Sequence, residues 1–167
     1  MKTRLMSTAF LSNRTNMLML KRNADRKLAP GLWTGVGGHI EPEEMNDPER
    51  ACIREILEET GISSDELIDL TFKYQLIRIK ETEIRVQYVY FGKTLKNHLI
   101  TNDEGELHWI DIESLLSLEL PWTIRAMLTH YLTTGMNTND PYVGVLTINP
   151  EGSPVMEWSS LKDPIVV

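Results

Sequence analysis

The order of the expected elements, strands, helix, strands and helix, predicts an α+β fold that forms a mixed sandwich of helices and sheet. Segments with strand character occur before and after a well-delimited amphipathic helix, and a second helix follows at about residues 121–133. The chain of 167 residues is long enough for one domain with a full hydrophobic core, and its sequence contains no repeats or low-complexity segment. We therefore expect residues 1–167 to form a single domain.

Apolar, aromatic and β-branched residues indicate where the strands lie, and polar or glycine-containing turns separate them. The expected strands cover residues 5–11, 17–20, 65–80, 83–95 and 107–110, with an extended segment at 33–40. A short helix is expected at 112–118 with Asp111 as its cap. The second helix should start at Pro121, run to about Thr133 and stop at Gly135.

The C-terminal part, at about 140–160, predicts a β-hairpin extension formed by residues 142–148 and 154–158. Three roles are open for it: it could complete a sheet edge, narrow a substrate cleft or form the contact of a homodimer.

The first helix has clear ends. Asp47 is a good N-cap, Pro48 suits the first helical position, and Glu49 places an acid in the first turn. Gly61 can adopt the left-handed conformation that closes a helix. Residues 48–60 are therefore expected to be helical.

One face of this helix is acidic. Glu55, Glu58 and Glu59 are spaced i, i+3 and i+4 and share that face, whereas the apolar side should pack on the core through Cys52, Ile53, Ile56 and Leu57. A glycine-rich segment, with Gly35, Gly37 and Gly38, precedes the helix and would let the backbone approach a ligand closely. Two interpretations follow from the residues alone. One is a solvated acidic face, and the other is a site for Mg²⁺ or Mn²⁺, which prefer oxygen ligands.

Composition restricts the function classes. The formal charge of −7 argues against a stable nucleic-acid partner or an anionic membrane surface. The single cysteine, Cys52, excludes an internal disulfide, and no apolar run is long enough to span a membrane. A short apolar stretch near the N-terminus is broken by serines, so we do not interpret it as a signal peptide. A cytoplasmic setting is expected.

The stretch from Gly38 to Ile62 resembles the signature of the Nudix (MutT-like) family, G-x5-E-x7-R-E-U-x-E-E-x-G-U, in which U is aliphatic. Gly38 is followed by five residues and Glu44, and Arg54 to Ile62 fits every position of the second half. One departure concerns the spacing, because nine residues instead of seven separate Glu44 from Arg54. The extra residues fall in the loop before Asp47, where insertions are tolerated, and they bring the role of Glu44 into question.

The resemblance implies the Nudix fold, an α/β/α sandwich in which a mixed β-sheet lies between helices. It also implies metal-dependent hydrolysis of a nucleoside diphosphate linked to another group. It implies that Glu58 and Glu59 are the main ligands of Mg²⁺ or Mn²⁺, together with the Gly37 carbonyl. Glu55 would be a further ligand or would position water, and Arg54 would hold the glutamates by ion pairs.

The substrate is expected to be a small nucleotide. We favour a nucleoside triphosphate, such as the oxidised 8-oxo-dGTP, cleaved to monophosphate and pyrophosphate. Glu104 or Glu106 could supply a base or ligand from a loop. The phosphates could be bound by four basic residues before the glycine segment, Lys21, Arg22, Arg26 and Lys27. The base could be contacted by two rings close to that segment, Trp33 and His39.

Other functions remain open. ADP-ribose or another nucleotide sugar is the second choice, because the C-terminal hairpin could build a pocket for the rest of such a substrate. A non-catalytic nucleotide sensor would be expected to have lost the helix acids, which are intact here. An isoprenoid diphosphate isomerase would need a suitably placed cysteine, and Cys52 is expected to be buried. A hydrolase of messenger RNA 5′ ends would need a basic stripe.

Overall fold

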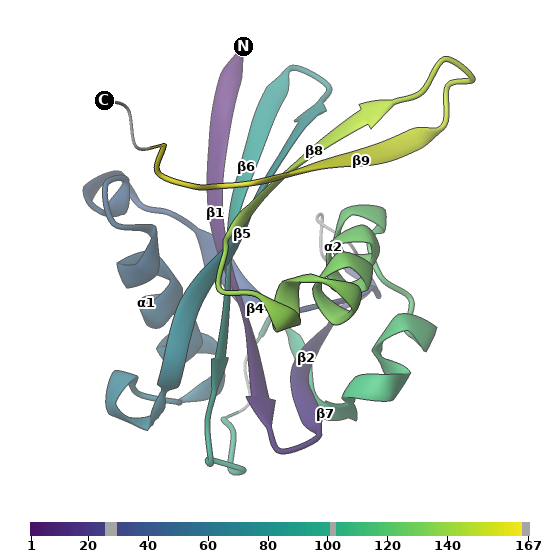
Figure 1. Cartoon of the computed structure of the whole chain (residues 1–167). Helices are drawn as coiled ribbons and strands as arrows, with labels where there is room; N and C mark the ends of the chain where they lie inside the picture. Colours follow the sequence, from purple (N-terminus) through teal and green to yellow (C-terminus); the bar gives the residue numbers. More distant parts are fainter. Residues whose placement is uncertain (26–29, 101–102, 165–167) are drawn as a thin grey trace.

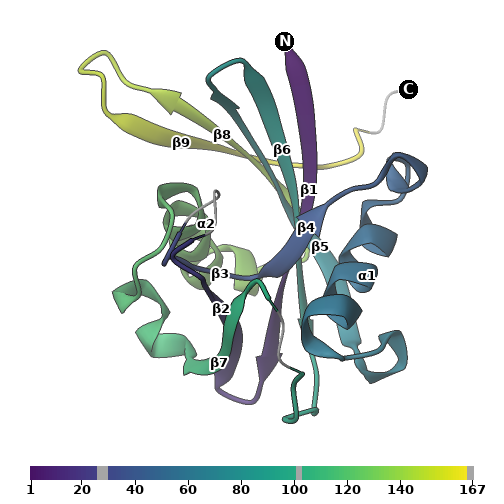
Figure 2. The ribbon, with the colours of Figure 1, turned by 180° about the vertical axis from the view of Figure 1, so that it is seen from behind.

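The computed structural model describes residues 1–25, 30–100 and 103–164. Within this part of the chain, nine strands form one sheet, with helix α1 (Pro48–Thr60) on one side and helix α2 (Trp122–Thr133) on the other (Figures 1 and 2). The predicted sheet between helices is therefore confirmed.

The sheet has the hydrogen-bonded order β3-β2-β1-β6-β5-β8-β9, while β4 pairs with β1 and β7 pairs with β2. It is mixed, because β1 runs parallel to β6 and β5 runs parallel to β8. The strands are β1 (Lys2–Asn13), β2 (Asn16–Arg22), β3 (Trp33–Thr34), β4 (Val36–His39), β5 (Ile68–Lys80), β6 (Glu83–Lys93), β7 (Gly105–Asp111), β8 (Tyr142–Ile148) and β9 (Pro154–Ser160).

Two hydrophobic cores lie on the two faces of the sheet, and β1 contributes to both. Phe10 belongs to the core that includes α2, whereas Ala9 and Leu11 belong to the core that includes α1. Alternate side chains of a strand point to opposite faces, so one buried strand can serve both layers.

Helix α1 packs through a different arc from the one expected. Cys52 and Ile56 are buried, as predicted, but Leu57 is 49% exposed. The buried arc continues through Glu59 and Thr60, which lie below Ile56 on the same side of the helix. A carboxylate that was expected on the acidic face is therefore turned toward the sheet.

The predicted ends of α1 are confirmed. The Asp47 side chain accepts a hydrogen bond of 3.1 Å from the backbone N–H of Arg50. Gly61 has a φ of 75°, and its N–H donates to the carbonyl of Leu57. Both ends of α2 differ from expectation: Pro121 is its N-cap rather than its first residue, and the C-cap is Thr134, with Gly135 starting a short 3₁₀ turn.

Three other elements differ from expectation. The strand expected from residue 65 begins at Ile68, because Ser63 and Glu66 form a capping box around a 3₁₀ turn. The extended segment at 33–40 is divided into β3 and β4. The short helix after Asp111 is a 3₁₀ helix, Ile112–Ser117, and Asp111 caps it by accepting from Glu113 N–H.

The C-terminal hairpin is confirmed, and it completes an edge of the sheet, because β8 pairs with β5. Trp158 of β9 packs over Gly144 and stacks on His130 of α2 with ring centroids 4.4 Å apart. These contacts attach the hairpin to the body of the molecule, while its tip extends outward (Figure 1).

Candidate active site

A cavity of about 870 Å³ lies beside β4 and the acidic face of α1. Its walls come from segments that are far apart in the sequence, including the starts of β1 and α2. The predicted site residues that line it are Arg22, Gly37, His39, Glu55, Glu59 and Glu104, and Gly38 of the glycine-rich segment lines it as well.

The glycines of β4 allow the acidic helix to approach the sheet. A Cβ atom at Gly38 would lie 2.5 Å from Oε1 of Glu55, so a side chain there would displace this carboxylate. Gly37 has a φ of 152°, and its N–H donates to Oε2 of Glu59 at 2.9 Å. The glycine segment and the two glutamates therefore form one structural unit.

The Glu59 carboxylate lies in an environment that disfavours its charge. The pKa of Glu59 is raised to about 8, mainly by burial; the nearby Glu55 and Glu104 add to the increase, whereas the Gly37 N–H and Arg22 oppose it. Burial also raises the pKa of Glu55, against the influence of Arg54. Carboxylates crowded in this way are stabilised by a bound cation, so the donor set fits a divalent metal ion.

Without metal, the stability of the folded protein should depend on pH through Glu59. The pKa of Glu59 is about 8 in the folded protein, against an ordinary value of 4.5, so folding is favoured as pH falls and this stability is lost as pH rises through 8. In EDTA, Glu59→Gln should remove this part of the pH dependence, since glutamine still accepts from Gly37 but does not titrate. At pH 8 the variant should melt several degrees above the wild type. Calorimetric Tm values at pH 6 and pH 8 test this, and equal pH dependence in both proteins would contradict it.

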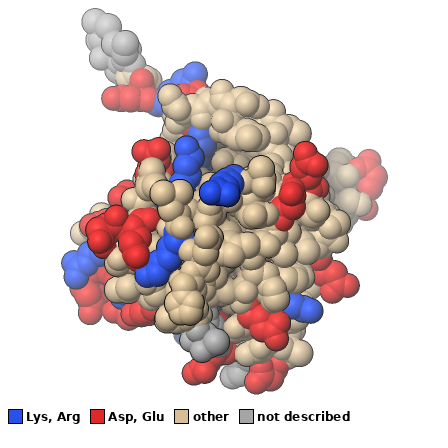
Figure 3. All heavy atoms as spheres, turned by 90° about the horizontal axis from the view of Figure 1, so that it is seen from below, with Lys and Arg blue, Asp and Glu red and all other residues tan. Residues whose placement is uncertain are grey.

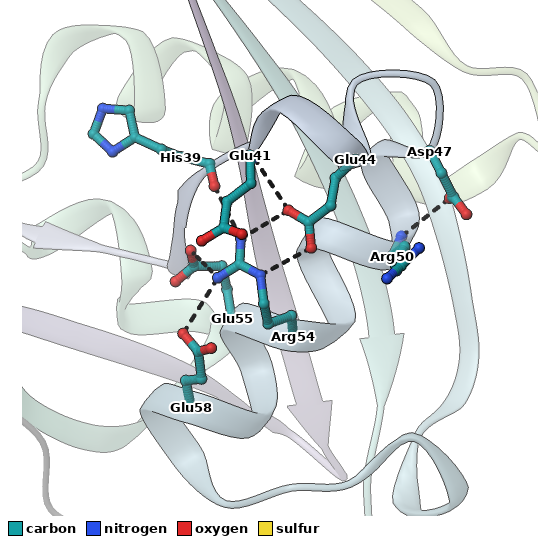
Figure 4. A network of polar contacts seen from close by, with 8 residues as sticks. All are labelled: His39, Glu41, Glu44, Asp47, Arg50, Arg54, Glu55 and Glu58. Carbon is teal, nitrogen blue, oxygen red and sulfur yellow. Dashed lines mark hydrogen bonds and ion pairs between the residues drawn. The ribbon is translucent and has the colours of Figure 1, made fainter.

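Arg54 is the centre of the polar network on α1 (Figure 4). Its Nε and Nη2 donate to the two carboxylate oxygens of Glu44, both at 2.9 Å. Its Nη1 donates to Glu55 at 2.8 Å and to Glu58 at 3.2 Å, and Nη2 also donates to the His39 carbonyl at 3.0 Å. The guanidinium thus joins the glycine strand to three glutamates.

Glu44 occupies a structural position despite the longer spacing to Arg54. It is 4% exposed and also accepts from the backbone N–H of Glu41. A 3₁₀ turn, Pro42–Glu44, and two turn residues before Asp47 accommodate the extra length. The insertion is therefore absorbed by the loop, and the pairing with Arg54 is kept.

The other predicted site residues either do not line the cavity or lie outside the described part of the chain. Glu58 has 58% of its side chain exposed, contacts Arg54 and does not line the cavity. Lys21 and Trp33 also lie outside the lining, with Lys21 Nζ 5.7 Å from the Trp33 ring centroid, so the structure does not bring these two to the cavity. Arg26 and Lys27 lie outside the described residues.

The two loop acids are separated by the start of β7. Glu104 lines the cavity and accepts from Nη2 of Arg22 at 3.2 Å. Glu106 lies within β7, pairs with His108 and has 74% of its side chain exposed. Glu104 is therefore the better-placed candidate for a base or ligand.

Sequence reasoning missed several residues of the cavity wall. Arg4, Arg78, Gln87 and Thr8 come from the middle or ends of strands, where no motif marks them. Nη1 of Arg4 lies 2.9 Å from Nε2 of His39. Burial lowers the pKa of His39, and Arg4 lowers it further, so a neutral ring accepts this hydrogen bond.

Among residues 1–25, 30–100 and 103–164, no three Asp, Glu, His or Cys side chains are already grouped as a complete metal site. Glu59 lies against the backbone of Gly37, and Glu55 lies against Gly38. Glu58 is engaged with Arg54 and is exposed enough to change rotamer.

Comparison with known proteins identifies the class that this fold and site define. The NUDIX domain model matches residues 2–131. The chain belongs to the Nudix family, as the signature predicted, and it is a hydrolase of that family.

Three curated relatives differ in the activity that their names state. Nucleoside triphosphatase NudI of Enterobacter sp. (strain 638) is 30% identical over 77% of this chain and 96% of its own length. An oxidized purine nucleoside triphosphate hydrolase of Danio rerio is 30% identical, over 54% of this chain and 56% of its own length. An isopentenyl-diphosphate Delta-isomerase of Corynebacterium diphtheriae is 25% identical over 77% of this chain and 78% of its own length.

Solved structures share the fold. A MutT protein from Bacillus halodurans superposes with a TM-score of 0.72 at 17% identity, covering 96% of this chain and 99% of that one. This coverage exceeds that of the family model, so the likeness extends into the C-terminal hairpin.

Proposed function

We propose that the chain hydrolyses a nucleoside triphosphate, such as an oxidised purine nucleotide, to monophosphate and pyrophosphate, with Mg²⁺ or Mn²⁺ as cofactor. The observation that carries this proposal is the crowding of Glu55 and Glu59 against the glycines of β4 at one end of a cavity. The Gly37 carbonyl, Glu55, Glu58 and Glu59 would hold the cation.

Each side chain has a distinct task in this proposal. A bound divalent ion would neutralise the diphosphate and lower the pKa of the attacking water. Arg22, which lines the cavity, would bind phosphate oxygens, and Glu104 or Glu55 would take the proton from the water. His39 is neutral and adjacent to Gly38, so it can hydrogen-bond the nucleotide.

The names of two relatives favour a triphosphate over ADP-ribose, since both state activity on nucleoside triphosphates. ADP-ribose remains the second candidate, because the cavity wall reaches Arg78 on β5, the strand that pairs with the hairpin.

The isomerase named among the relatives is not favoured by the site. The isomerase interpretation requires a cysteine at the reacting carbons. Cys52 is 1% exposed on the packing face of α1, outside the cavity lining, and burial raises the pKa of its thiol. The intact helix acids likewise disfavour a non-catalytic sensor.

The proposed partner is a small molecule. On the face shown in Figure 3, the described basic side chains are interspersed with acidic ones and form no continuous stripe of the kind that nucleic acids require. In the described part of the chain, no helix is long and apolar enough to cross a membrane. A cytoplasmic location stays a prediction.

A substrate panel with Mg²⁺ tests the proposal. Triphosphates should give one monophosphate and pyrophosphate, whereas ADP-ribose would give AMP and ribose 5-phosphate. We expect kcat/KM for at least one triphosphate, 8-oxo-dGTP or another, to exceed that for ADP-ribose. If ADP-ribose surpassed every triphosphate, the second candidate would replace the first.

A further inference from the structure

Three arginines form a row across three neighbouring strands. Arg4 on β1 pairs in register with Arg85 on β6, and Arg85 pairs with Arg78 on β5. Directly paired residues point to the same face of a sheet. Arg4 and Arg78 line the cavity, and Arg85 and Arg78 border a small hollow of about 10 Å³.

The row carries more positive charge than its surroundings neutralise. Glu83 accepts from Arg4 at 3.1 and 2.8 Å and from Arg85 at 3.2 and 3.1 Å. Arg78 has no hydrogen-bond or ion-pair partner among the described residues, and neither does the buried Nη1 of Arg85. Like charges side by side destabilise a sheet, and Glu83 contacts only two of the three guanidinium groups, so the row has positive charge that an anionic ligand could neutralise.

The local electrostatics favour the binding of an anion. Burial lowers the pKa of Arg78, and the neighbouring Arg85 lowers it further. With one carboxylate against three guanidiniums, about two positive charges remain. A phosphate monoester carries about −1.5 to −2 at neutral pH and accepts bidentate hydrogen bonds from arginine, which matches this excess better than a single carboxylate does.

The row lies away from the acids that would hold the metal. Gly37 is paired with Thr8 on β1, and Arg4 lies four residues before Thr8. At roughly 3.3 Å per residue along a strand, the separation is about 13 Å. A diphosphate bound at the glycine strand would not reach the arginines by itself, so they would contact a different part of the same ligand.

We propose that Arg4, Arg85 and Arg78 form a second anion subsite, which binds a phosphate monoester separated from the scissile diphosphate by a spacer of nucleoside size. The assignment of a cleaved diphosphate at the glycine strand rests on the proposed function, whereas anion binding by the three arginines does not. Of the described lining residues, only His39 has an aromatic ring, so the cavity offers little stacking surface and much charge.

The direct test is calorimetric titration of the full chain with inorganic phosphate in EDTA, where the acidic end of the cavity repels anions. Wild type should bind phosphate, and Arg78→Gln should weaken binding at least tenfold. Arg4→Gln, at the other end of the row, should weaken it as well, and it serves as the second variant if Arg78→Gln does not fold. Lys93→Gln removes the same charge from the far end of β6, where the side chain is 66% exposed, and should bind as wild type does.

Equal binding by wild type and Arg78→Gln, or an equal loss in Lys93→Gln, would overturn the proposal. Adenosine is the neutral probe. If Arg78→Gln lost adenosine binding but kept phosphate binding, the row would bind a base instead of a phosphate. ADP-ribose and its 2′-phosphate differ by one phosphate and provide a competition assay. The phosphorylated form should compete better for wild type but not for Arg78→Gln. None of these readouts needs turnover, so a protein that binds phosphate through Arg78 but hydrolyses no nucleotide would refute the proposed function alone.

Discussion

Glu58→Gln is expected to lower kcat at saturating Mg²⁺ by at least about 10²-fold, as the loss of charge stabilisation in a metal-assisted reaction does. Glutamine keeps the size of the side chain and can still accept from Arg54, so the fold should be retained. The structure makes this a stringent test, because Glu58 is exposed and its contact with Arg54 contributes little stability. A large effect would therefore report metal ligation rather than packing.

Glu49→Gln is the matched control. Glu49 lies in the first turn of the same helix, is exposed and does not line the cavity, so its variant should keep near wild-type turnover. Mg²⁺ titrations of both variants, followed by Tm as well as by rate, separate ligand loss from unfolding. Near wild-type turnover in Glu58→Gln would remove this residue from the ligand set and leave Glu55 and Glu59.

Local signals explain which parts of the fold could be predicted from the sequence. The caps of α1 depend on neighbouring residues, so Asp47 and Gly61 could be identified without tertiary information. The strands follow composition and alternation over a few residues, and their boundaries shifted where a turn such as the one at Ser63 intervened. The prediction that Leu57 packs on the core was wrong, because two i, i+4 apolar pairs on a short helix do not fix which arc faces the sheet.

Residues whose role depends on strand register could not be predicted in the same way. Arg4, Arg85 and Arg78 are distant in the sequence and meet only because β1, β6 and β5 are neighbours. Conversely, Lys21 and Trp33 lie next to Arg22 and Thr34, which line the cavity. Successive side chains of a strand point to opposite faces, so Lys21 and Trp33 are not part of the lining. The pairing of Glu44 with Arg54 could not be predicted either, because it depends on the path of the longer loop between them.

Arg54→Ala is expected to weaken Mg²⁺ binding by about 10- to 100-fold, the usual cost of losing a group that orients metal ligands. KM for the nucleotide should change by a smaller factor than the Mg²⁺ affinity does. Arg54 contacts Glu55 and Glu58 and is absent from the cavity lining, which indicates a positioning role rather than substrate contact. Stability should fall as well, because Glu44 would be left buried without its partner, at a cost of about 1–3 kcal/mol.

Two comparisons separate the positioning role from general destabilisation. Arg50→Ala removes the same charge one helical turn earlier, where the side chain is exposed, and should leave Mg²⁺ affinity unchanged. The double variant Arg54→Ala with Glu44→Gln should be at least as stable as Arg54→Ala alone, since it also removes the unpaired charge. Its Mg²⁺ affinity should stay low, because Glu55 and Glu58 have still lost their donor. If Arg54→Ala raised KM and left both Mg²⁺ affinity and kcat unchanged, Arg54 would be a substrate contact, and the five hydrogen bonds that it donates would serve only to hold it in place.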